Sequence, residues 1–129
     1  MIKAEDLRIG DLVRYGDKVI TLTAVHANGS VCFADGKDQM YSEDVLLEPI
    51  PLTPEILEKN GWKKRTEGWY FMMISKYMYL SVEFGYENGI RVFLKRATDG
   101  LYVKLNIANN VHELQHILWA LGKDANLKI

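Results

Sequence analysis

The residues with the clearest chemical potential are two histidines and a glutamate close together near the end of the chain. His112, Glu113 and His116 form the sequence His-Glu-Leu-Gln-His. On a helix, positions four apart share a face, so both imidazoles could bind one zinc ion while the glutamate acts as general base on a metal-bound water. A zinc-dependent hydrolase is therefore one hypothesis for this chain.

A catalytic zinc also needs a third protein ligand, and the sequence does not supply one at the usual spacing. After His116 there is neither a histidine nor a glutamate, only Asp124. The remaining histidine, His26, falls in a different predicted unit. The alternative is an amphipathic helix whose polar face happens to carry these side chains. We therefore expect a non-enzymatic protein with no catalytic residues, no metal and no cofactor.

A second group combines aromatic and cationic side chains at alternating positions of three predicted strands. Its members are Tyr77, Tyr79, Arg91, Phe93, Lys95, Tyr102 and Lys104. Alternation places them on the sheet face that points away from the predicted core. An exposed aromatic patch usually marks an interface, so a protein partner or a homo-oligomer is the first expectation.

Two other readings of this face stay open. Rings that stack bases beside cations that neutralise phosphates give the alternative function, single-stranded nucleic-acid binding. The structural alternative is that tyrosine and phenylalanine simply favour strands, or that the face packs on another part of the chain.

Charge is unevenly distributed along the 129 residues. The whole chain has 16 Lys and Arg against 17 Asp and Glu, which disfavours a strongly basic nucleic-acid binder as a description of the entire protein. Residues 1–61 hold six basic and 11 acidic residues, whereas residues 62–104 hold eight basic and four acidic ones. The change of sign near Gly61 indicates two structural units with different surfaces.

The first unit, residues 1–51, is predicted to be a small SH3-like β-barrel. Short apolar segments at 12–15, 19–25, 31–33, 39–41 and 45–47 are separated by turn signals such as Asn28-Gly29 and Asp35-Gly36. Four or five short strands with tight turns are typical of such a barrel. The three prolines, at positions 49, 51 and 54, mark the junction with the second unit.

The second unit, residues 52–129, is predicted to be an antiparallel sheet packed with a short helix and a C-terminal helix, which makes the fold class α+β. Alternating apolar residues at 69–74, 77–84, 90–95 and 101–107 predict strands with one buried face. Thr53 is placed to cap the short helix. The apolar stripe of the helix at 111–121 is expected to cover the sheet. The cations at 63–65 are interpreted as a solvated loop.

Cys32 is the single cysteine, so no intrachain disulfide can form, which suits a reducing compartment. The charged first residues lack the apolar core of a signal peptide, and the longest apolar run, 69–74, is too short to span a bilayer. We expect a cytoplasmic protein that does not enter a membrane. A small ligand between the two units stays open.

Five segments of the chain carry a resemblance to known proteins: residues 7–11, 48–53, 61–62, 111–116 and 120–121. Through them the chain resembles a family of small proteins from Bacteroides-type gut bacteria and their phages or integrated mobile elements. The family brings no established activity. Its helix reads His-Gln-Leu-Gln-Asn, so Glu113 and His116 depart from the pattern and look incidental. The resemblance and the missing catalytic set together favour an accessory protein of a phage or mobile element that acts through protein–protein contacts.

Overall fold

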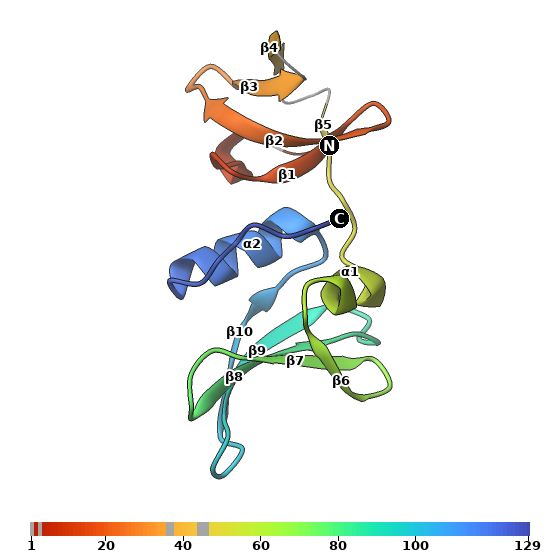
Figure 1. Cartoon of the computed structure of the whole chain (residues 1–129), viewed down its shortest axis with the longest axis vertical. Helices are drawn as coiled ribbons and strands as arrows, with labels where there is room; N and C mark the ends of the chain where they lie inside the picture. The colour runs from red at the N-terminus through yellow and green to blue at the C-terminus, as the bar shows by residue number, and fades with distance from the viewer. Residues whose placement is uncertain (1, 3, 36–37, 44–46) are drawn as a thin grey trace.

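Helix α2 (Val111–Ala120) lies between two five-stranded antiparallel sheets in the computed structural model, which describes residues 2, 4–35, 38–43 and 47–129 (Figure 1). The α+β class predicted from the sequence is confirmed. No helix in these described ranges is long and apolar enough to cross a membrane.

The first sheet follows a 3₁₀ turn (Ala4–Asp6) and is a meander. Its strands are β1 (Leu12–Tyr15), β2 (Lys18–Val25), β3 (Ser30–Asp35), β4 (Asp38–Glu43) and β5 (Leu47–Glu48), in the order β4-β3-β2-β1-β5. The Asn28-Gly29 turn forms where it was predicted, and the Asn28 Oδ1 atom accepts the Ser30 N–H at 3.1 Å. Val13, Leu22, Val31 and Phe33 are among the residues of its buried core.

The SH3-like barrel predicted for residues 1–51 is not confirmed. A closed barrel needs its end strands to pair, but β4 and β5 are the two ends of an open sheet in the described part of the chain. β5 has only two residues, because prolines at 49 and 51 lack the N–H that would extend it. The predicted positions Gly36, Val45 and Leu46 lie outside the described residues.

The second sheet follows helix α1 (Pro54–Lys59), which Thr53 caps as predicted by accepting the Ile56 N–H at 3.3 Å. Its strands are β6 (Lys63–Thr66), β7 (Trp69–Met73), β8 (Met78–Glu83), β9 (Arg91–Arg96) and β10 (Tyr102–Ile107), in the order β10-β9-β8-β7-β6. Four of these strands were predicted. The predicted loop at 63–65 is instead β6, whose side chains all stay exposed while its backbone pairs with β7.

The two helices cover one face of the second sheet, as predicted. On α2, Val111, Leu114 and Leu118 join a buried cluster that also contains Leu80, Val82, Val92, Leu57 and Trp62. The core of the first sheet is a separate cluster, drawn from residues 2–47. The boundary between units at 51 and 52 stays a prediction, and the second cluster extends across it, because it includes Ile50 and the partly buried Leu12.

Candidate functional site

The face of the second sheet that points away from the helices carries nearly all of the predicted site residues. Strand pairing places them in rows: Lys63, Phe71, Ser81, Phe93 and Lys104 in one, Trp69, Glu83 and Arg91 in the next, and Met73, Tyr79, Lys95 and Tyr102 in the third. Arg65 belongs with these residues, because its guanidinium donates to the Tyr79 hydroxyl at 2.9 Å. We call this set of residues the outer face.

Six of the seven predicted residues therefore share one surface, and only Tyr77 falls outside the strands. Tyr77 precedes β8 in a turn, is 57% exposed, and its carbonyl accepts the Ala97 N–H at 2.7 Å. The prediction omitted Lys63, Arg65, Trp69, Phe71, Ser81 and Glu83. The alternation of Trp69 and Phe71 could have predicted that both lie on this face, whereas β6 has no apolar alternation that would predict a strand.

Glu83 lies on β8, the central strand of the sheet, and its side chain is buried on the outer face, with 3% of it exposed. Its Oε2 atom accepts from the Lys95 ammonium at 2.7 Å and from the Ser81 hydroxyl at 2.8 Å. Its Oε1 atom accepts from the Tyr86 hydroxyl at 3.1 Å. Burial, followed by the hydrogen bond to Glu83, raises the pKa of the Tyr86 phenol. Lys95 is thus committed to an internal ion pair.

Aromatic rings form a layer around this carboxylate. The Lys95 ammonium lies 5.0 Å from the Trp69 ring centre, and the Phe93 and Tyr102 rings meet edge to face at 5.5 Å. The Arg91 guanidinium stacks 4.0 Å above the Tyr86 ring. Cation–π contacts of this kind stabilise the layer itself, so Arg91 and Lys95 serve the fold as well as the surface.

Accessibility divides the predicted residues into two groups. Tyr79 and Phe93 are only 9% and 8% exposed, whereas Tyr102 is 64% exposed and Lys104 is also open to solvent. A hollow of about 480 Å³ opens at one end of the outer face, between Arg65, Phe71 and Tyr79 and the β9–β10 turn. The outer face can therefore be contacted through its edges and this hollow, and less through its centre.

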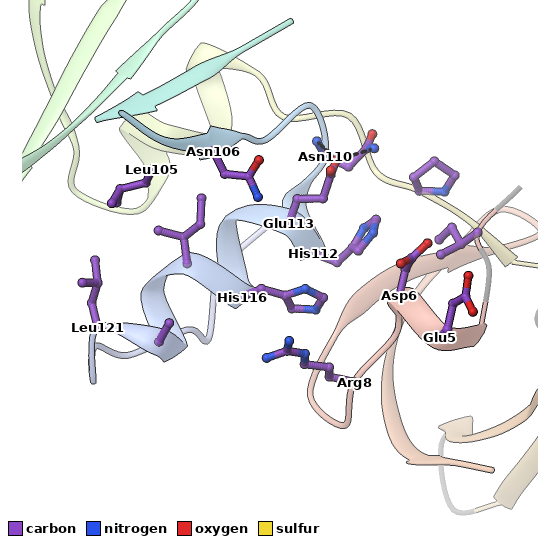
Figure 2. Close-up of a pocket in the computed structure, with 14 residues that line it drawn as sticks. Glu5, Asp6, Arg8, Leu105, Asn106, Asn110, His112, Glu113, His116 and Leu121 are labelled. Atoms are coloured by element: carbon purple, nitrogen blue, oxygen red, sulfur yellow. Dashed lines mark hydrogen bonds between the residues drawn. The ribbon is translucent and has the colours of Figure 1, made fainter. Parts of the chain in front are cut away.

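A separate cleft of about 710 Å³ runs beside α2, between the 3₁₀ turn and the end of β10 (Figure 2). His112, Glu113 and His116 line one side, and Glu5, Asp6 and Arg8 line the other. His112 is 5% exposed, and its Nδ1 atom is buried without a hydrogen-bond partner. Burial lowers the pKa of His112, which favours its neutral form.

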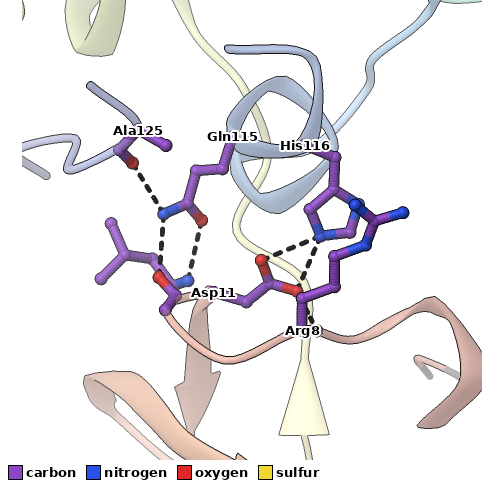
Figure 3. A network of polar contacts seen from close by, with 7 residues as sticks. Arg8, Asp11, Gln115, His116 and Ala125 are labelled. Atoms are coloured by element: carbon purple, nitrogen blue, oxygen red, sulfur yellow. Dashed lines mark hydrogen bonds and ion pairs between the residues drawn. The ribbon is translucent and has the colours of Figure 1, made fainter. Parts of the chain in front are cut away.

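The polar face of α2 joins the helix to the first sheet (Figure 3). The Gln115 Oε1 atom accepts the Leu12 N–H at 2.8 Å, and its Nε2 atom donates to the carbonyls of Gly10 and Ala125, each at 3.0 Å. The His116 Nε2 atom lies 2.9 Å from both carboxylate oxygens of Asp11, which is 1% exposed. These two side chains bridge segments about a hundred residues apart.

No family model matches this chain, and no curated protein or solved structure is significantly similar to it. Its function must therefore be argued from the geometry.

That geometry gives the His-Glu-Leu-Gln-His segment a structural explanation. Glu113 accepts hydrogen bonds from the backbone and side-chain nitrogens of Asn110, at 3.1 and 2.9 Å, and so closes a capping box at the start of α2. His116 contacts Asp11. Within the described residues, no group of three or more His, Cys, Asp or Glu side chains is placed to hold a metal ion. We do not adopt the zinc hydrolase hypothesis as the proposed function.

Proposed function

We propose that this chain is a non-enzymatic interaction protein that binds an acidic segment of a protein partner on its outer face. The observation that carries the proposal is a charge imbalance. The outer face holds five cationic side chains, at positions 63, 65, 91, 95 and 104, and one carboxylate, Glu83, which Lys95 already neutralises. Lys63, Arg65 and Lys104 remain exposed, so they are accessible for ion pairs with carboxylates of a partner.

Exposed rings beside these cations fit a protein interface. Tyr102 and Trp69 are 64% and 37% exposed, and tyrosine and tryptophan are enriched where proteins bind one another. Single-stranded nucleic acid is the alternative, since the same cations would attract phosphates. Base stacking needs open ring faces, however, and the central rings, Tyr79 and Phe93, are buried. We therefore favour the acidic protein segment.

The first test compares a glutamate-rich peptide with an oligothymidylate of equal charge, each labelled for fluorescence anisotropy. We expect the peptide to bind more tightly than the oligonucleotide and to weaken as salt rises. The double variant Lys63→Glu/Arg65→Glu should lose peptide binding by about tenfold or more, because each reversal places a like charge against the ligand. Lys123→Glu/Lys128→Glu has the same charge change away from the outer face and should bind like the native chain.

Each other outcome decides against the proposal. Tighter binding of the oligonucleotide, lost in the Lys63/Arg65 variant, would replace it with the nucleic-acid alternative. Equal losses in both double variants would mean that the attraction follows net charge and not this surface. No peptide binding at low salt would also refute it. Circular dichroism of both variants verifies that the fold is retained.

A further inference from the structure

The two edges of the second sheet are built differently. Every side chain of β6 is exposed, and three of its four residues are cations, which is how natural sheets prevent pairing at an edge. The β10 edge begins with three consecutive exposed apolar side chains: Leu101, Tyr102 and Val103 are 63%, 64% and 62% exposed. β10 is paired with β9 on one side only and lies at the rim of its sheet (Figure 1).

The pairing of β10 with β9 shows which of its backbone groups point outward. The Arg96 N–H donates to the Leu101 carbonyl at 2.8 Å, and the register continues with Val103 opposite Leu94. Residues of an antiparallel strand bond alternately to one side and the other. The Leu101 carbonyl and the backbone groups of Val103 therefore bond to β9, while the N–H and C=O groups of Tyr102 and Lys104 point away from the sheet.

We propose that β10 pairs antiparallel with β10 of a second copy of this chain, with the two-fold axis at Val103. In this register Tyr102 lies opposite Lys104 of the second copy, and Val103 lies opposite its own counterpart. The outward groups of Tyr102 and Lys104 would then form about four intermolecular hydrogen bonds, two for each Tyr–Lys pair. The two sheets become one continuous ten-stranded sheet with both outer faces on the same side.

Charge and backbone geometry disfavour a shift of the axis toward the C-terminal end of β10. Moving the axis to position 104 would set the two lysines directly against each other, which is unfavourable. Moving it toward Ile107 meets an irregular edge, because the ladder shifts between Lys104 and Asn106 and the Asn106 Oδ1 atom already accepts the Ile107 N–H at 2.8 Å. With the axis at Val103, each Tyr102 ring instead faces a lysine ammonium, a favourable cation–π pair.

A second copy of this chain fits this edge, because the two-fold axis places a Tyr102–Lys104 pair on each side of Val103. An isologous contact of this kind closes at two subunits. The edge left at each end of the joined sheet is β6, whose cations oppose further addition. The interface is one strand long, so we expect dissociation on the order of micromolar concentration.

Sedimentation velocity over a range of concentrations tests the proposal. The native chain should convert from monomer to dimer as concentration rises. Val103→Lys and Val103→Glu should each stay monomeric, because each sets two like-charged side chains directly opposite each other at the axis, with their Cβ atoms about 5 Å apart. An equimolar mixture of the two variants should form dimers again. Val19→Lys, at a valine on β2 that is 44% exposed, is the matched control and should dimerise like the native chain.

Three results would overturn the proposal. A native chain that stays monomeric up to about 100 times the expected dissociation constant has no such interface. Dimers of Val103→Lys as stable as the native ones would place the contact elsewhere. Failure of the mixed variants to dimerise would show that the two positions at 103 do not meet. None of these results depends on whether the outer face binds an acidic peptide.

Discussion

Glu83 is the residue on which the order of the outer face depends. It is the carboxylate that Lys95, Ser81 and Tyr86 share as acceptor, and it is almost completely buried. A buried charge of this kind is tolerated because a counter-charge and hydroxyl donors replace the lost water. The network keeps the surrounding rings in a fixed layer.

Glu83→Ala should destabilise the fold by about 3–5 kcal/mol, since it leaves the half-buried Lys95 ammonium without its counter-charge. Denaturation by urea measures this loss. Glu67→Ala is the control, because the Lys64–Glu67 pair is exposed, with side-chain exposures of 46% and 91%, and should show little change. If the two variants unfolded at the same urea concentration, Glu83 would not have the role assigned to it.

At this scale the sequence predicted which residues share a face but not how deeply each one lies. Period-two alternation correctly brought Tyr79, Phe93 and Lys95 together. Burial of the first two depends on neighbours from other strands, among them Arg65, Phe71 and Tyr102. Those contacts follow from strand register, and local pattern does not determine register. Glu83 was missed for the same reason.

Helix α2 has two buried faces with different chemistry. Its apolar face packs on the second sheet, whereas Gln115 and His116 contact the first sheet and His112 is buried beside them. The helix and its apolar stripe were predictable from the spacing of Val111, Leu114 and Leu118. The contacts of its polar face were not predictable, because they are made with the first sheet, about a hundred residues earlier in the chain.

Stability should decrease as the pH falls through about 6.5, the ordinary pKa of histidine. Burial lowers the pKa of folded His112, so the unfolded chain takes up a proton that the folded chain does not, and acid favours unfolding. His112→Gln should make the decrease in unfolding free energy between about pH 7.5 and 5.5 shallower. Urea denaturation at several pH values measures it.

His26→Gln serves as the control for this experiment, because it removes an exposed histidine away from the cleft. It should retain the steeper pH dependence of the native chain. Equal slopes in the native chain and in His112→Gln would contradict the assignment. Asp6, Asp11, Glu113 and His116 also act on His112 electrostatically, so the comparison concerns the difference between variants and not the total slope.

The cationic strand β6 shows a limit of pattern reading at the scale of elements. Its residues, Lys63–Thr66, have no apolar alternation and no strong strand formers except threonine. The strand forms because its backbone pairs with the edge of β7. The predicted barrel is not confirmed, and the reason is related: the number of strands was predictable, but closure depends on contacts between distant ends of the sheet.

The whole molecule is held together by a small polar joint between its first sheet and α2. Gln115 alone satisfies three backbone groups, at residues 10, 12 and 125, while it is itself 3% exposed. Apolar packing is concentrated within each sheet's own cluster. The relative placement of the two sheets therefore depends on this side chain together with the His116–Asp11 contact and with Leu12, which packs against the second sheet's cluster.

Gln115→Leu should cost at least about 2 kcal/mol of stability, because it leaves buried backbone groups without partners. Amide exchange at Leu12 should accelerate, since its N–H loses its acceptor. Glu113→Gln, two positions away, keeps an oxygen for the capping box and should cost less than about 1 kcal/mol. Unchanged exchange at Leu12 in Gln115→Leu would show that the joint is not needed to protect the first sheet.

This joint also affects the order in which segments of the protein can become native during synthesis. Leu12 and Gln115 are separated by 103 positions, and Asp11 and His116 by 105. A ribosome releases the N-terminal strands long before the helix that must contact them. Until residues 115 to 125 emerge, the nascent chain presents Gly10, Asp11 and Leu12 with unmet polar groups. The synthesis of residues 115 to 125 thus decides when residues 10 to 12 become fully native.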